Sequence, residues 1–159
     1  MDAGIGGVML QSTDWQGGLR DRELPVTSQQ RDMVMPALES SIETIKAKVN
    51  GRIHALVNNA ATTKFNAHGN LDGLSGEDFL RIYGINVVGP YQMIRAVAPH
   101  MKKAGRGVVV NIASLAGVNA IGSSVAYCAS KAALINMTVA LARVLGPEIR
   151  VNAICPGFI

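Results

Sequence analysis

The chain has 159 residues, of which 48% are hydrophobic and 16% are charged, and its formal net charge is +4 at pH 7. This length suits one domain, and the composition is too apolar for an intrinsically disordered chain. The positive charge forms no basic stripe, so we expect no nucleic-acid partner. We also expect no membrane association, because no apolar run approaches the roughly 18 residues of a span and the N-terminus lacks a basic signal region.

Two cysteines, Cys128 and Cys155, stand in unrelated contexts. Neither belongs to a Cys-x-x-Cys pair and no histidine lies at ligand spacing, so no metal site is predicted. A reduced, cytoplasmic location fits this cysteine content best.

The N-terminal third carries the weakest pattern. Residues 1–22 are glycine-rich and form an atypical segment, and residues 23–27 are a candidate short edge strand that contains Pro25. Apolar residues at helical spacing then predict a helix over 28–49, which Pro36 would kink or divide.

From residue 53 onward, apolar strands alternate with helices. We predict strands at 53–57, 108–113 and 149–154, and helices at 76–101 and 125–145. Ser75 should cap the first of these helices, and Gly84, Gly89 and Pro90 predict a bend or break inside it. This alternation with short connections predicts βαβ units and therefore a parallel, doubly wound sheet of the α/β class.

Ligands of such sheets bind outside the carboxyl ends of the strands. Tyr127 and Lys131 stand four residues apart on a predicted helix beside that edge, so they share one helix face. A phenol has a pKa of about 10, and a neighbouring ammonium stabilises the phenolate, so the pair could move a proton to or from a substrate oxygen. Taken alone, the same spacing fits a surface tyrosine beside a solvated lysine.

Two further polar residues strengthen the catalytic interpretation. Ser114 follows a predicted strand, where its hydroxyl could position a reacting oxygen; the alternative is a loop serine that satisfies its own backbone. Asn86 falls inside a predicted helix, where asparagine is not favoured. It is either exposed there or the partner of a kink near Gly84 and Gly89.

Five segments then carry a family resemblance in one order: LVNNAA, INVVGPYQMIRAVAPHM, GVVVNIASLAG, AYCASKAALINMTVALARVL and IRVNAICPGFI. They cover about residues 50–159 and resemble the ordered motifs of the short-chain dehydrogenase/reductase family. The resemblance implies a single, partial, Rossmann-like dinucleotide-binding domain over 1–159. It also implies NAD or NADP as cofactor, a small alcohol or carbonyl substrate, and a homo-oligomer for a complete family member.

The resemblance implies four catalytic roles. Tyr127 would be the acid/base, Lys131 the cation that stabilises the phenolate and holds the nicotinamide ribose, and Ser114 the residue that orients the substrate oxygen. Asn86 would bend its helix and hold a water in the proton relay. We expect these four side chains to converge on one cleft at the carboxyl edge of the sheet.

The implied cofactor-binding positions lie at the ends of successive strands and on the catalytic helix: Asn58, Asn59, Ala60, Ile112, Tyr127, Lys131, Pro156 and Gly157. Ala61 replaces the usual glycine of the Asn-Asn-Ala-Gly motif. Asn111, on the strand under the cofactor, is interpreted as structural.

The N-terminal part of the family pattern is poorly matched. The phosphate-binding fingerprint is Thr-Gly-x-x-x-Gly-x-Gly after a first strand, and only Gly4-Ile5-Gly6 resembles its tail, with no room for a strand before it. Pro25-Val26-Thr27 stands where the family has Asp-Val-Thr, so the adenine-contacting carboxylate is missing. The chain also stops at Ile159, before the family's substrate loop. We therefore expect a truncated member whose isolated chain binds the cofactor weakly or not at all.

Two functional hypotheses follow. The first is an oxidoreductase that transfers a hydride between NAD(P)(H) and an alcohol/carbonyl substrate, with Tyr127 as acid/base. The alternative is a non-catalytic remnant or interaction module on the same scaffold. The intact Asn, Ser, Tyr and Lys set favours the first hypothesis, and the missing fingerprint favours the second. A nucleotide-binding domain of another class would explain the fold but not these four residues.

Overall fold

The computed structural model describes residues 53–157 together with Ser40, Glu43 and Ala47. These three isolated residues are helical, as predicted for that stretch. The predictions for residues 1–22 and 23–27, and for the other positions of the 28–49 helix, lie outside the described residues.

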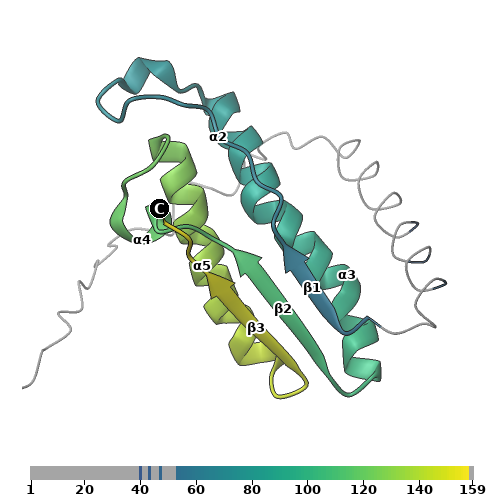
Figure 1. Ribbon diagram of the computed structural model, residues 1–159. Helices are drawn as coiled ribbons and strands as arrows, with labels where there is room; N and C mark the ends of the chain where they lie inside the picture. The colour runs from purple at the N-terminus through teal and green to yellow at the C-terminus, as the bar shows by residue number, and fades with distance from the viewer. Residues whose placement is uncertain (1–39, 41–42, 44–46, 48–52, 158–159) are drawn as a thin grey trace, which may run out of the picture. The chain divides into compact units, whose positions relative to one another are not determined.

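Strands and helices alternate in the described part (Figure 1). In chain order the elements are β1 (Ala55–Asn58), the 3₁₀ turn η1 (Leu71–Gly73), α2 (Gly76–Tyr83), the π-helical turn η2 (Gly84–Val88), α3 (Gly89–Lys103), β2 (Gly107–Ile112), α4 (Ala116–Asn119), α5 (Val125–Leu145) and β3 (Ile149–Ile154). The predicted bounds of α5 and β3 agree with the structure. β1 is shifted toward its carboxyl end, and α4 lies in a segment for which no helix was predicted.

The three strands form one parallel sheet in the order β1-β2-β3. Leu56, Val109 and Val151 lie side by side across it. Figure 1 shows α3 and α5 on the same face of this sheet. Two successive right-handed crossovers that advance in one direction place both helices on one face. The predicted parallel sheet is therefore confirmed, and its carboxyl edge collects the segments that follow all three strands.

The hydrophobic core fills the space between this face and the two helices. Its buried side chains are Ile94, Val97 and Met101 of α3 with Val109, Ile149 and Val151 of the sheet, and α5 adds Leu141, Ala142 and Leu145 at the border. Full burial of one such large side chain contributes roughly 1.5–3 kcal/mol. This core holds α3 and α5 rigidly on the sheet and so fixes the side chains that they carry.

The helix predicted over 76–101 is divided into α2, η2 and α3. Ser75 caps α2 as predicted: Ser75 Oγ accepts from Asp78 N at 3.1 Å, and Asp78 Oδ2 accepts from Ser75 N at 3.0 Å. The break comes at Gly84, whose carbonyl accepts from the Gly89 N–H five residues later. Such π-helical turns are rare and occur frequently at functional sites. Asn86 lies in the middle of this one.

We expected no segment long and apolar enough to cross a membrane, and α5 meets both criteria. The helix also packs on the sheet through Leu134 and Thr138, both buried. A core helix of a globular domain has the same length and composition as a span, which explains why α5 meets the criteria.

Candidate active site

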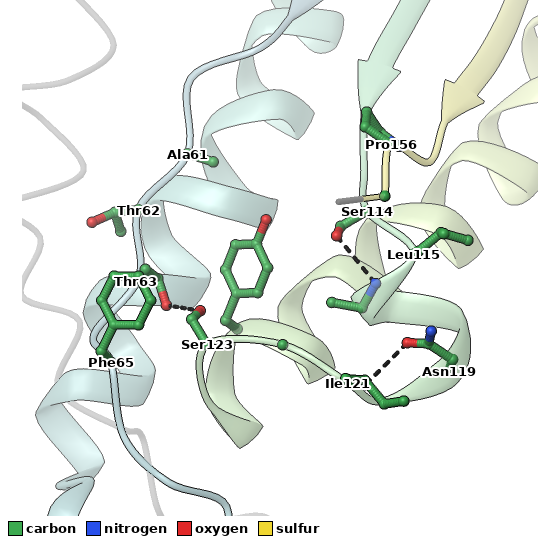
Figure 2. A pocket seen from close by; sticks show the side chains of 14 residues that line it. Ala61, Thr62, Thr63, Phe65, Ser114, Leu115, Asn119, Ile121, Ser123 and Pro156 are labelled. Carbon is green, nitrogen blue, oxygen red and sulfur yellow. Dashed lines mark hydrogen bonds between the residues drawn. The ribbon is translucent and has the colours of Figure 1, made fainter. Parts of the chain in front are cut away.

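A cleft of about 630 Å³ opens at the carboxyl edge of the sheet. Figure 2 shows Ala61, Thr62, Thr63 and Phe65, which follow β1, along one side of it, and Ser114 and Leu115, which follow β2, along the other. Pro156 and Gly157 after β3 and Tyr127 from the first turn of α5 complete the lining. This volume is in the range of small-molecule binding sites.

Ser114 lines the cleft and also serves its own backbone. Its Oγ accepts a hydrogen bond from Ala116 N at 3.1 Å, at the start of α4. The hydroxyl hydrogen remains to be donated, because a hydroxyl both donates and accepts. Leu115 N donates to Pro156 O at 2.9 Å and fixes the segments after β2 and β3 to each other. Ser114 therefore satisfies its own backbone and also keeps a donor for a reacting oxygen, so the two interpretations of this serine are compatible.

Tyr127 is held at the beginning of α5. The buried Ser124 caps the helix, since its Oγ accepts from Tyr127 N at 3.3 Å. No hydrogen bond of the Tyr127 hydroxyl occurs among the described residues. Lys131 Nζ lies 5.7 Å from the centroid of the Tyr127 ring. An ammonium at this distance interacts favourably with the ring.

Lys131 is buried, so it is not the solvated lysine of the alternative interpretation. It is 2% exposed, and its Nζ donates to Ile112 O, the last carbonyl of β2, at 2.7 Å. Burial lowers the pKa of Lys131 from its ordinary 10.5, and Cys155 acts in the opposite sense. An ammonium has three donors, so two N–H groups remain for a ligand at the sheet edge.

Asn86 is buried and fully bonded. Its Oδ1 accepts from Thr62 N at 2.8 Å, and its Nδ2 donates to Thr62 O at 2.9 Å and to Ser130 Oγ at 2.9 Å. The side chain therefore joins the segment after β1 to α5, one residue before Lys131. Of the two interpretations left open by the sequence, the kink partner is correct and the exposed asparagine is wrong.

A network of hydrogen-bonded polar side chains crosses the sheet on the face that the helices cover. Asn58 Nδ2 donates to Asn111 Oδ1 at 2.8 Å, and Asn111 Nδ2 donates to Thr138 Oγ1 of α5 at 2.9 Å. Asn111 is 0% exposed, and both the oxygen and the nitrogen of its amide take part in these bonds. Asn111 is therefore structural, as interpreted from the sequence, and the Asn58 side chain belongs to the same hydrogen-bond network. Asn59 and Ala60 follow β1 and are exposed.

The cysteine beside Tyr127 offers no competing nucleophile. Cys128 is buried, and burial raises the pKa of its thiol above the ordinary 9.0. A thiol that stays protonated is inert at neutral pH.

The four predicted catalytic residues thus lie in two layers. Ser114 and Tyr127 line the cleft, whereas Lys131 and Asn86 are not among its lining residues and contact it from behind, through the Tyr127 ring and through Thr62. Sequence reasoning missed Ser130 and most of the lining: Thr62, Thr63, Phe65, Leu115, Asn119, Ile121 and Ser123. The available signal was the presence of large apolar residues, Phe65, Leu115 and Ile121, in the loops that follow two of the strands.

Comparison with known proteins decides the family. The profile of the short chain dehydrogenases matches residues 22–159. The chain belongs to the short-chain dehydrogenase/reductase family. A curated relative, the 2-(R)-hydroxypropyl-CoM dehydrogenase of Xanthobacter autotrophicus, is 43% identical over 110 residues, which are 69% of this chain and 44% of the relative. The chain spans about half the length of the curated relatives it matches.

Solved structures of family members share the fold. A short-chain dehydrogenase/reductase from Burkholderia xenovorans has a TM-score of 0.75 at 40% identity, covering 78% of this chain and 51% of that one. NAD+-bound xylitol dehydrogenase gives 0.71 at 35% identity over 78% and 47% of the two chains. ElxO with NADP bound gives 0.72 at 29% identity over 79% and 50%. The described sheet is thus part of a Rossmann-like fold, and both nicotinamide cofactors occur among its neighbours.

Proposed function

We propose that this chain carries the catalytic centre of an oxidoreductase that transfers a hydride between NAD(H) or NADP(H) and an alcohol/carbonyl substrate. The observation that carries the proposal is the buried Lys131 ammonium, 5.7 Å from the ring of a tyrosine that lines a cleft together with Ser114. A buried cation beside a phenol has a clear use in moving a proton. The substrate would be a small molecule, and the protein would act in the cytoplasm.

Tyr127 would transfer the proton to or from the substrate oxygen. Lys131 would hold its positive charge beside the Tyr127 ring, and its bond to Ile112 O fixes the position of that charge. Ser114 would donate its free hydroxyl hydrogen to the same substrate oxygen, which stabilises developing negative charge there. Tyr127 would thus supply the proton and Ser114 the hydrogen bond, and Lys131 would supply a positive charge beside the Tyr127 ring.

Asn86 is proposed as a positioning residue. Both hydrogens of its amide are used, one on Thr62 O and one on Ser130 Oγ. The effect of the Asn86 side chain is to fix Thr62, which lines the cleft, relative to the helix that carries Tyr127 and Lys131.

The residues present fit the nicotinamide end of the cofactor. Lys131 has two N–H donors left for ribose hydroxyls, and Ile112, Pro156 and Gly157 lie at the same edge. When bound, the nicotinamide supplies or accepts the hydride. The positions that resemble a pyrophosphate fingerprint, Gly4 to Gly6, lie outside the described residues.

The test is turnover by the purified protein with a panel of alcohols and ketones, followed by cofactor absorbance. NAD(H) and NADP(H) are supplied in large excess, because the isolated chain is expected to bind them weakly. We expect turnover that Tyr127→Phe abolishes and that Tyr91→Phe, at an exposed tyrosine of α3, leaves unchanged. Absence of turnover with every pair would favour the alternative, a non-catalytic module on the same scaffold.

A further inference from the structure

We propose that the cleft selects uncharged substrates that carry an aromatic or alicyclic body next to the reacting carbonyl. The inference rests on the proposed function, because it takes Ser114 and Tyr127 as the end where the carbonyl lies. Small sugars, keto acids and other charged carbonyl compounds would be poor substrates. Three features of the lining support this assignment.

The first feature is charge. Among the described residues, none of those that line the cleft is an acid, a lysine, an arginine or a histidine. Lys64 lies in the lining loop but is paired with Asp78 at 2.6 Å. The guanidinium of Arg81, outside the lining, donates to Thr62 Oγ1 at 3.2 Å. A carboxylate or phosphate on the substrate would lose its hydration in this cleft without a cation to replace it.

The second feature is that most polar groups of the lining are already bonded to protein. Thr63 Oγ1 and Ser123 Oγ share a hydrogen bond of 2.6 Å, and Asn119 Oδ1 accepts from Ile121 N at 3.0 Å. Thr62 Oγ1 accepts from Arg81. A polyol substrate would have to compete with these bonds.

The third feature is the exposed apolar surface at the other positions. Phe65 is 85% exposed, Ile121 is 70% exposed and Leu115 is 44% exposed, although all three line the cleft. Clustered exposed apolar residues of this size mark binding surfaces. Phe65 and Ile121 also line an adjoining groove of about 570 Å³, together with the polar residues Asn66, His68 and Ser123. A substrate body that covers the apolar side chains would remove them from water.

The loops that carry Phe65 and Ile121 are fixed before any substrate arrives. Asn66 N donates to Ser123 O at 2.9 Å, beside the Thr63–Ser123 bond shown in Figure 2. His68 Nε2 lies 3.2 Å from Gly122 O and adds a third link. A surface held in this way loses little conformational entropy on binding, so its apolar contacts appear as affinity.

The experiment compares two ketones that differ by one charged substituent: benzylacetone and benzylacetone with a carboxylate at the para position. Their dissociation constants are measured by ligand-observed NMR on the purified protein, with and without cofactor, and turnover is measured in parallel. We expect benzylacetone to bind at least about 10-fold more tightly than the carboxylate. Phe65→Ala should weaken benzylacetone about 10-fold, and Ile121→Ala should weaken it independently, since one well-placed apolar group is worth about that factor. Leu80→Ala is the matched control, because Leu80 is 64% exposed on α2 and does not line the cleft.

Equal affinities, tighter binding of the carboxylate, or no effect of Phe65→Ala and Ile121→Ala would each overturn the proposal. Binding preference with no turnover would support the selectivity and contradict the proposed reaction. Turnover of both ketones at equal kcat/KM would do the reverse.

Discussion

Asn86 and Thr62 exchange two hydrogen bonds, in which the asparagine side chain meets both the N–H and the C=O of one backbone residue. The Asn86 amide thereby gives Thr62, in the segment after β1, the two backbone hydrogen bonds that a neighbouring strand would otherwise provide. The π-helical turn η2 brings Asn86 to this place, and its remaining amide hydrogen reaches Ser130 of α5. One buried side chain thus joins three segments around the candidate active site.

Replacing Asn86 with alanine should destabilise the fold. Thr62 N, Thr62 O and Ser130 Oγ would lose a partner in a buried region, and one unsatisfied buried group costs about 1–3 kcal/mol. We expect the free energy of unfolding to fall by at least about 2 kcal/mol, measured by denaturant unfolding. Asn119→Ala is the control, because Asn119 is exposed and its side chain accepts one bond. Equal losses in the two variants would show that the Asn86 bonds have no special weight.

Gly117 sets the distance between α4 and α5. A Cβ at this position would lie 2.6 Å from Ala132 N and 2.6 Å from Lys131 C, both backbone atoms that cannot turn aside. Gly117→Ala should therefore push α4 away from α5, cost about 1–3 kcal/mol of stability, and lower kcat/KM by moving Ser114. Gly76→Ala meets nothing within 4 Å and should be neutral or slightly stabilising. Crystal structures and melting curves of both variants would check this; an unchanged Gly117→Ala protein would contradict it.

Lys131 links stability to pH in a predictable direction. Its pKa is lower than 10.5 in the folded chain, because of burial, and ordinary in the unfolded chain. Below both values the lysine is protonated in both states, and the folded state bears the full cost of a buried charge. As pH rises through the folded pKa toward 10.5, the folded chain loses its proton first and the wild type gains stability relative to Lys131→Met.

The measurement is the difference in unfolding free energy between wild type and Lys131→Met from pH 7 to pH 11, at the same salt concentration. Lys102→Met, at an exposed lysine near the end of α3, should show no such trend. A flat difference for Lys131→Met would mean that the buried amine is not desolvated as the structure indicates. Loss of turnover at pH 7 should accompany the substitution in either case.

The sequence predicted the framework of this fold better than its cleft. Strong apolar runs and clear turn residues placed α5 and β3 correctly, and Ser75 and Gly84 marked a cap and a break that the structure contains. α4 was missed because four residues are too few to show helical periodicity. The two-layer arrangement of Ser114 and Tyr127 in front of Lys131 and Asn86 depends on side-chain burial. Spacing along one helix does not reveal burial, since Tyr127 and Lys131 share a face whether that face is solvated or packed.

The apolar lining was beyond a motif-based prediction for a related reason. Phe65 and Ile121 come from two loops that are distant in sequence and joined by hydrogen bonds to Ser123 and Gly122. Neither loop has periodicity, so only coordinates bring the two side chains to one cleft.

The most direct test of the central claim is single-turnover hydride transfer in Tyr127→Phe, followed by nicotinamide absorbance, beside Tyr91→Phe as control. The cofactor is supplied in large excess, because the isolated chain is expected to bind it weakly. If Tyr127 is the acid/base, the phenylalanine variant should transfer hydride about 10² to 10⁴-fold more slowly, while the cofactor dissociation constant stays within about 2-fold of wild type. Tyr91→Phe should match wild type in both quantities. A Tyr127→Phe protein that transfers hydride at the wild-type rate would contradict the claim and return Tyr127 to the role of a cleft-lining aromatic residue.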